Sequence, residues 1–198
     1  MARDPGTDLV VLRHGQTNWN LEHRFQGRSD IPLNASGVAQ AKAAAATLGR
    51  FAFDAVYASP LERAHQTAQL VCPDTEIHLD ERLMEIDVGG WSGLTWEQVT
   101  ALMPAYEAHY ANGVDFRRSS TGETMADVVA RGLPAVEEIA ARHQGETLLI
   151  VSHGLLLNRV LHALLGLEGR VLGGLGNAHY SELAFHHGGW RLLSHNVG

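Results

Sequence analysis

Several features that would each assign a protein to a class are scarce or missing here. Cys72 is the only cysteine among 198 residues, so no intramolecular disulfide is possible and a cytoplasmic location is expected. The segment Met1–Asp8 is polar and lacks the apolar core of a signal peptide. No apolar run approaches the length of a membrane span, so a membrane partner is not expected either.

Basic residues are also fewer than acidic ones. The chain has 15 Lys and Arg against 22 Asp and Glu, which gives a formal net charge of −7. A broad nucleic-acid-binding surface is therefore not expected. A few arginines gathered at one place can still bind a small anion, and the overall charge does not exclude such a site.

Metal-ligand patterns are missing despite 12 histidines. There is no HExxH sequence and no Cys/His ligand spacing. Neighbouring residues on a strand point to opposite faces, so His186 and His187 make a poor chelating pair. The stretch Gly173–Asn177 resembles a phosphate-binding loop in composition only, because it lacks a lysine and follows no predicted strand. We expect neither a metal nor another cofactor.

The patterns that are present predict a single α/β domain over residues 1–198. Predicted strands and helices alternate, which is typical of a three-layer fold with a central, mostly parallel sheet and helices on both faces. The expected strands are 9–13, 54–58, 76–79 and 148–152, with a C-terminal hairpin at 182–186 and 190–195. The expected helices are 36–50, one opening at 59–60, 95–103, 104–110, 124–143 with a kink at Pro134, and 155–165. Residues 18–34 and 115–122 are expected to be loops.

A buried strand followed by His-Gly occurs twice. Leu9–Leu12 leads into Arg13-His14-Gly15, and Leu148–Ser152 leads into His153-Gly154. Ligands of open parallel sheets bind at the carboxyl ends of the strands. If the two strands are parallel neighbours, both histidines face one crevice, and this pairing predicts a functional site.

An arginine is placed where an anion could bind. Ser59-Pro60 is typical of a helix start, with Arg63 in the first turn near the positive end of the helix dipole. Position alone fits a solvated surface arginine equally well.

Four segments in this order carry a resemblance to a known family. They are Arg13–Asn20 (RHGQTNWN), Ser59–Ala64 (SPLERA), Glu85 in the glycine-rich loop 82–93, and Ser152–Gly154 (SHG). Together they resemble the histidine phosphatase superfamily, also called phosphoglycerate mutase-like. The similarity extends from residue 9 to about residue 185.

The resemblance implies a role for each matching residue. His14 would attack phosphorus and carry the phosphoryl group as phosphohistidine. Arg13, Arg63 and His153 would complete the phosphate pocket, since guanidinium groups pair with phosphate oxygens and keep their charge. Glu85 would act as general acid and then general base, with Asp87 as a lower-ranked alternative. The resemblance further places Asn20, Gln26 and Gly154 against the phosphate or substrate; loop hydrogen bonding is the alternative for Asn20 and Gln26.

The motifs alone do not decide whether the chain belongs to the phosphatases or to the mutases of this family. The mutase members carry a longer insertion after the acid loop, and the compact segment between Glu85 and His153 favours the short phosphatase branch. Arg117 and Arg118 leave open the alternative that the protein is a cofactor-dependent phosphoglycerate mutase, because mutases bind a substrate carboxylate with an arginine pair. Here the pair could equally bind an acidic phosphoester or lie in solvent.

Within the phosphatases, residues 173–183 are similar to a stretch in actinobacterial glucosyl-3-phosphoglycerate phosphatases. The expected partner is a small phosphate ester such as a sugar phosphate or a phosphoglycerate-type ester, and a homodimer is possible. The alternative to an enzyme is a non-catalytic module that binds a phosphorylated ligand. It predicts loss of at least one of the five catalytic positions, all of which are present.

Overall fold

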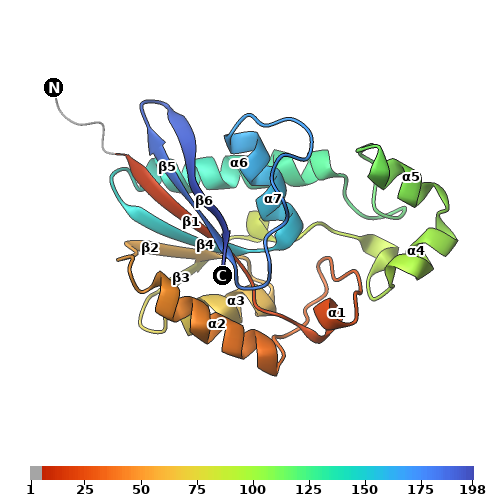
Figure 1. Cartoon of the computed structure of the whole chain (residues 1–198), viewed down its shortest axis with the longest axis horizontal. Helices are drawn as coiled ribbons and strands as arrows, with labels where there is room; N and C mark the ends of the chain where they lie inside the picture. The colour runs from red at the N-terminus through yellow and green to blue at the C-terminus, as the bar shows by residue number, and fades with distance from the viewer. Residues whose placement is uncertain (1–5) are drawn as a thin grey trace.

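A six-stranded sheet in the order β3-β2-β4-β1-β5-β6 forms the centre of the computed structural model, which describes residues 6–198 (Figure 1). The strands are β1 (Thr7–Arg13), β2 (Ala55–Ala58), β3 (Ile77–Leu79), β4 (Thr147–Ser152), β5 (Tyr180–His186) and β6 (Gly189–Val197). β1 to β4 pair in parallel, whereas β5 runs antiparallel to β1 and forms the predicted hairpin with β6. The mostly parallel sheet is confirmed.

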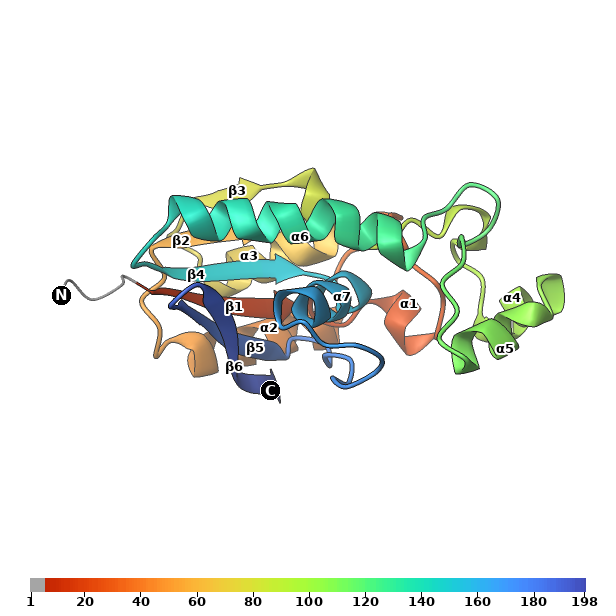
Figure 2. The same cartoon turned by 90° about the horizontal axis from the view of Figure 1, so that it is seen from above.

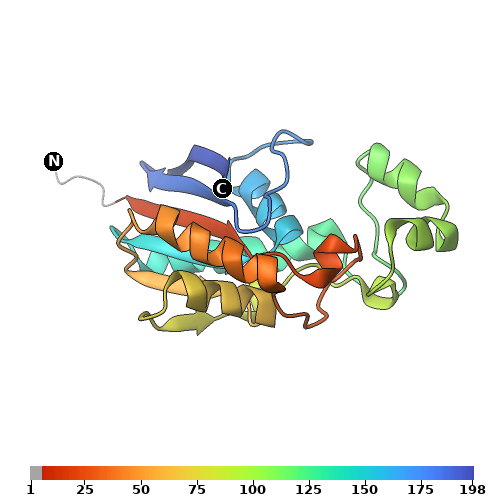
Figure 3. The ribbon, with the colours of Figure 1, turned by 60° about the horizontal axis from the view of Figure 1, so that its bottom comes forward.

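Two helices cover each face of the sheet (Figures 2 and 3). α2 (Ala35–Leu48) and α3 (Glu62–Val71) pack on one face, while α6 (Met125–Arg142) and α7 (Gly154–Leu164) pack on the other. Because side chains of β1 alternate, Val10 and Leu12 join the core with α2 and α3, and Leu9 and Val11 join the core with α6 and α7. The predicted three-layer architecture is confirmed.

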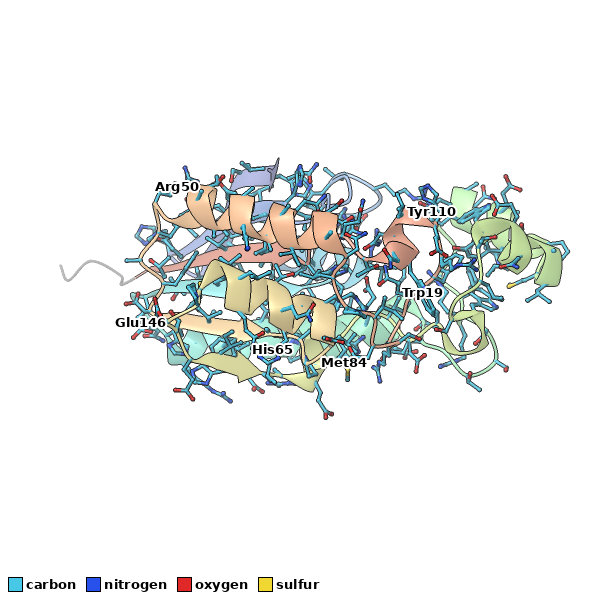
Figure 4. All side chains as sticks on the ribbon, turned by 90° about the horizontal axis from the view of Figure 1, so that it is seen from below. Trp19, Arg50, His65, Met84, Tyr110 and Glu146 are labelled. Carbon is cyan, nitrogen blue, oxygen red and sulfur yellow. The ribbon has the colours of Figure 1, made fainter. Side chains whose placement is uncertain are left out.

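Three short helices lie beyond the carboxyl ends of the parallel strands. They are α1 (Asn18–Leu21), α4 (Trp96–Leu102) and α5 (Ala105–Ala111), and the last two project from the body of the molecule (Figures 1 and 2). Tyr106 holds this projection together, with its ring centroid 4.6 Å from that of Trp96 and 5.5 Å from that of Phe116. In Figure 4, Trp19 and Tyr110 lie at this end, and Arg50 and Glu146 lie at the opposite one.

Several expected boundaries need correction. α1 lies within a stretch expected to be a loop, because Thr17 and Asn20 form a capping box that nucleates one helical turn. Asn34, rather than Ser36, caps α2 by accepting a hydrogen bond from the Gly37 N–H. α3 begins at Glu62 with Leu61 as its N-cap, and the Ser59 hydroxyl contacts His153 Nε2 and accepts from the Leu61 N–H.

The longest helix, α6, continues on both sides of Pro134. Across residues 6–198, no helix is long and apolar enough to span a membrane. Most of the polar N-terminal segment considered above, residues 1–5, lies outside the described residues.

Candidate active site

His14 follows β1 directly and is buried, with 3% of its surface exposed. Its Nδ1 lies 2.7 Å from the carbonyl oxygen of Gly15, so the Nδ1–H tautomer donates to this oxygen and leaves the lone pair of Nε2 free. Burial, followed by the charges of Arg63 and Arg13, holds the pKa of His14 well below its usual value. The imidazole is therefore neutral at neutral pH, the form in which a ring nitrogen is a nucleophile.

His153 follows β4 and lies beside His14, with ring centroids 5.2 Å apart. The two strands are parallel neighbours in which Arg13 pairs with Ser152, so the crevice expected from the sequence is present. His153 Nε2 is 2.8 Å from the hydroxyl of Ser59. Burial, together with the charge of Arg63, lowers the pKa of His153 well below its usual value.

Arg63 is one of the most buried side chains of the molecule, at 1% exposure. It occupies the first turn of α3 and donates to the carbonyl oxygens of Ser29 and Gly27, both at 2.8 Å. Burial lowers the pKa of its guanidinium to about 10, so the group stays cationic at neutral pH. The solvated-arginine alternative is therefore excluded.

Arg13 enters the same region from the end of β1. Its guanidinium donates to the carbonyl oxygen of Leu175 at 2.6 Å, and burial lowers its pKa. Gly154 packs against this arginine, because a Cβ atom at Gly154 would lie 3.2 Å from Arg13 Nε. A side chain at position 154 would push the guanidinium aside.

Three buried nitrogens around His14 have no hydrogen-bond partner among the described residues. They are Arg13 Nε, Arg63 Nε and His153 Nδ1. Leaving such groups unsatisfied costs about 1–3 kcal/mol each, which native proteins accept where a ligand completes the bonding. Two of them belong to cations, so the arrangement suits an anion such as phosphate.

Glu85 lies in the loop that follows the 3₁₀ turn Glu81–Leu83. Its carboxylate accepts from the backbone N–H groups of Leu155 and Leu156 at the start of α7, both at 3.1 Å, and of Ile86 at 3.0 Å. The positive end of the helix dipole thus holds the carboxylate in place.

The Glu85 carboxylate also interacts with both Arg13 and Arg63, whose pKa values it raises against the effect of burial. A carboxylate, two guanidinium groups and two neutral imidazoles therefore converge.

Asp87, the alternative to Glu85, makes different contacts. One of its carboxylate oxygens accepts from the Gly89 N–H at 2.7 Å, and the residue is absent from the wall of the neighbouring cavity. Glu85 does line that cavity, together with Arg13 and Gly154. Of the two carboxylates, Glu85 is therefore the one that can reach a molecule bound in the cavity.

This cavity has a volume of about 670 Å³ and lies between α5, α7 and the segments that precede α6 and β5. Arg118 is buried and lines it, whereas Arg117 is 54% exposed and pairs with Asp127 at 3.3 Å. The structure therefore brings only one member of the arginine pair to the cavity.

Asn20 and Gln26, the two loop residues expected to contact the phosphate or substrate, differ in their hydrogen bonding. Asn20 Oδ1 accepts from the Thr17 N–H at 3.1 Å and from Asn177 Nδ2 at 3.3 Å, which supports the loop-bonding interpretation. Gln26 is buried, and its Oε1 has no hydrogen-bond partner among the described residues. Gln26 is the better candidate for a ligand contact.

Sequence analysis missed three residues that shape the site. Ser59 bonds His153, and Asn177 donates to the carbonyl oxygen of His14 at 3.1 Å. Both lie in stretches that had been singled out for other reasons. Arg131 on α6 donates to the carbonyl oxygens of Arg82, Met84 and Glu85 at 2.9, 2.6 and 2.9 Å. No local pattern distinguishes Arg131 from a solvated helix arginine.

Comparison with known proteins gives matches over nearly the whole chain. The family model described as "Histidine phosphatase superfamily (branch 1)" matches residues 9–198. A glucosyl-3-phosphoglycerate phosphatase of Mycobacterium tuberculosis is 35% identical over 191 residues, 90% of this chain and 85% of that protein. A metal-independent phosphoserine phosphatase of Arabidopsis thaliana is 36% identical over 161 residues, 78% of this chain and 67% of that protein.

A solved structure agrees with these matches. The phosphoserine phosphatase of Entamoeba histolytica in complex with 3-phosphoglyceric acid has a TM-score of 0.86 and 32% identity, covering 97% of this chain and 98% of that one.

Proposed function

This chain belongs to the histidine phosphatase superfamily and is a phosphomonoester hydrolase acting on phosphorylated metabolites, and we propose that His14 is the nucleophile of its reaction. The family resemblance predicted from the sequence motifs is confirmed. The observation that carries the assignment of His14 is its neutral, buried imidazole beside cationic nitrogens that have no partner.

In the first step, Nε2 of His14 attacks phosphorus. The P–N bond forms as the ester P–O bond breaks, and the carboxyl group of Glu85, protonated from water in the enzyme–substrate complex, gives its proton to the departing alkoxide. In the second step, Glu85 takes a proton from water, whose oxygen attacks phosphorus. The P–N bond breaks, inorganic phosphate leaves, and both His14 and Glu85 return to their starting forms.

Arg13 and Arg63 stabilise charge on the phosphoryl oxygens in both steps. Phosphoryl transfer passes through a loose transition state, which needs positioning and positive charge more than covalent assistance. The burial of both side chains supports this role, because a charge interaction is stronger where water is excluded. His153 and Gln26 complete the pocket.

Water, rather than a second substrate hydroxyl, is the proposed acceptor of the phosphoryl group. The compact segment between Glu85 and His153, which contains α4, α5 and α6, supports this proposal, because the resemblance associates the mutases with a longer insertion here. We therefore expect release of inorganic phosphate and very little interconversion of 2- and 3-phosphoglycerate, even with added bisphosphoglycerate. Efficient isomerisation that depends on the bisphosphate would overturn this assignment.

The proposed reaction needs no metal. In residues 6–198 there is no group of three His, Cys, Asp or Glu side chains arranged to hold a metal ion, and one relative is named metal-independent. Activity should survive EDTA; loss of turnover that a divalent ion restores would contradict the proposal. The cytoplasmic location and the homodimer stay predictions.

The decisive experiment is a rapid-quench assay with a phosphate monoester labelled at phosphorus. An acid-labile, base-stable label on the protein, lost in the His14→Asn variant, is the expected result. Multiple turnovers without any labelled enzyme species would contradict a phosphohistidine intermediate.

A further inference from the structure

The cavity beside the proposed phosphate site follows one face of α7. Gly154, Leu155, Asn158 and Arg159 all line it, at the spacing of one helical face. Gly154 marks the phosphate end, because it packs against Arg13. Five residues at about 1.5 Å each place Arg159 about 7.5 Å further along the helix.

Positive charge gathers at this second end. Arg159 of α7, Arg170 of the following segment and Arg118 all line the cavity. Asp115 lies 3.6 Å from Arg118, but its two oxygens also accept from the N–H groups of Met125 and Ala126 at the start of α6. Among residues 6–198, no carboxylate lies within 4 Å of the guanidinium groups of Arg159 or Arg170.

The cluster is electrostatically unfavourable by itself. Burial and the charge of Arg170 lower the pKa of Arg159, and burial and the charge of Arg159 lower the pKa of Arg118; the Asp115 carboxylate raises both pKa values but does not offset these effects. Arg159 Nε is buried and has no hydrogen-bond partner among the described residues. The chain as a whole is acidic, so this local excess is not a general property of its surface. A bound anion would remove the repulsion.

The position of the Arg170 guanidinium is fixed by Tyr110 of α5. Arg170 donates to the backbone carbonyl oxygen of Tyr110 and lies over its ring, 4.4 Å from the centroid. A guanidinium held in this way loses less conformational freedom when it binds a ligand.

We propose that Arg159 and Arg170 form a second anion subsite, which selects phosphate esters that carry another acid group several bonds away from the phosphate. This inference rests on the proposed function, which places the ester phosphate near Arg13 and His14. A cavity of about 670 Å³ is of the size that holds a whole metabolite. We expect esters of three-carbon acids, in which a single carbon separates the carboxylate from the phosphorylated carbon, to be too short to reach both ends.

The test compares esters that differ only in the remote group. 6-Phosphogluconate and glucitol 6-phosphate have the same six-carbon chain, ending in a carboxylate or in a neutral alcohol. We expect kcat/KM to favour 6-phosphogluconate by about tenfold to hundredfold, the range for charge-assisted hydrogen bonds. Glucitol 1,6-bisphosphate, with a phosphate as the remote group, shows which acid the subsite prefers.

The residues are tested with the double variant Arg159→Gln/Arg170→Gln. The acid-to-neutral ratio of kcat/KM should fall towards one, and this ratio cancels any loss of folded protein. The matched control, Arg142→Gln/Arg191→Gln, removes the same charge from residues outside the cavity wall and should keep the ratio. Retention of the ratio in the Arg159/Arg170 variant, or an equal loss in the control, would overturn the proposal.

A short pair of esters adds a second criterion. The kcat/KM ratio for 3-phosphoglycerate over glycerol 3-phosphate should not respond to Arg159 and Arg170, since only one carbon separates that carboxylate from the phosphorylated carbon. An equal response would mean that the arginines act through general charge and not as a remote subsite. Failure of the proposed function is separable, because it would abolish hydrolysis of nitrophenyl phosphate as well.

Discussion

Around His14 the polar side chains are buried or half-buried and are contributed by strand ends and the first turn of a packed helix, whereas most of the residues around Arg170 are exposed. The inner region, made of Arg13, His14, Arg63 and His153, lies at the ends of sheet strands and in the first turn of a packed helix. The outer region, made of residues 105–118 and 166–174, belongs to a projecting helix and two long loops. Rigid packing suits chemistry that is common to every ester, and exposed loops suit the discrimination between esters.

Glu85 and Arg131 connect the two regions. Glu85 contacts the first turn of α7 and lines the cavity, and Arg131 holds the backbone of the Glu85 loop from α6. Arg131 is itself fixed by an ion pair with Glu123, whose carboxylate also binds the Asp87 N–H and Arg28. The comparison therefore predicts that substitutions in the inner region slow the hydrolysis of every substrate. Substitutions in the outer region should slow the hydrolysis of only some substrates.

The largest effect is expected at the centre of the inner region. His14→Asn removes the proposed nucleophile and should lower kcat on the order of 10⁴-fold or more for every phosphate ester. His65→Asn, which changes a histidine of α3 that is not part of the inner region, is the matched control and should retain activity (Figure 4). A His14 variant that still forms labelled phosphoenzyme would remove the basis of the comparison.

Glu85→Gln should give the next largest effect, and one that depends on the leaving group. An alkoxide departs poorly without a proton, whereas nitrophenolate is stable as an anion, so only the alkyl ester needs the general acid. We expect the phosphorylation burst to slow by roughly 10²–10⁴-fold for a sugar phosphate and far less for nitrophenyl phosphate.

Both carboxylate oxygens of Glu85 accept backbone hydrogen bonds, so the glutamine also loses at least one acceptor. That structural loss affects both esters alike. Equal slowing of the two bursts would mean that Glu85 only positions the loop.

Arg131→Lys tests the connection between the regions. Lysine keeps the charge beside Glu123 but cannot hold three carbonyl oxygens with a planar fork. A displaced Glu85 should lower kcat for alkyl esters by about tenfold to hundredfold, and less for nitrophenyl phosphate. Arg142→Lys, on the exposed end of the same helix, is the control. A uniform loss for both esters would assign Arg131 to stability alone.

The smallest effect concerns stability and pH. His14 and His153 are held neutral in the folded protein, with pKa values well below the value near 6.5 of an unfolded chain. As pH falls below about 6.5, the unfolded state binds protons that the folded state does not, so folding stability decreases, with a slope of up to about 1.4 kcal/mol per pH unit for each histidine.

Denaturant unfolding between pH 7.5 and 5.0, in buffer without phosphate, measures this slope. The carboxylates with lowered pKa values, such as Glu123 and Asp80, weaken folding only at lower pH. The double variant His14→Asn/His153→Asn should show a shallower slope between pH 6.5 and 5.0. An unchanged slope would place the acid sensitivity elsewhere in the molecule.

The sequence by itself determined the sheet, the crevice and most of the inner region. Each of these depends on local signals: an apolar run that ends in His-Gly predicts a strand end, and Ser-Pro predicts a helix start with Arg63 in its first turn. The rule that parallel strands end at one edge then brings His14 and His153 together without any knowledge of distant contacts.

Only the tertiary structure decided how Glu85, Arg131, Arg159 and Arg170 are used. The Glu85 carboxylate is seated by amides 70 and 71 residues later in the chain, and periodicity carries no information about such pairings. Neighbouring residues of a loop also separate unpredictably, so Arg118 turns into the cavity and Arg117 turns to Asp127. A surface arginine and a ligand-binding arginine look alike in sequence, because the difference lies in which segments fold around them.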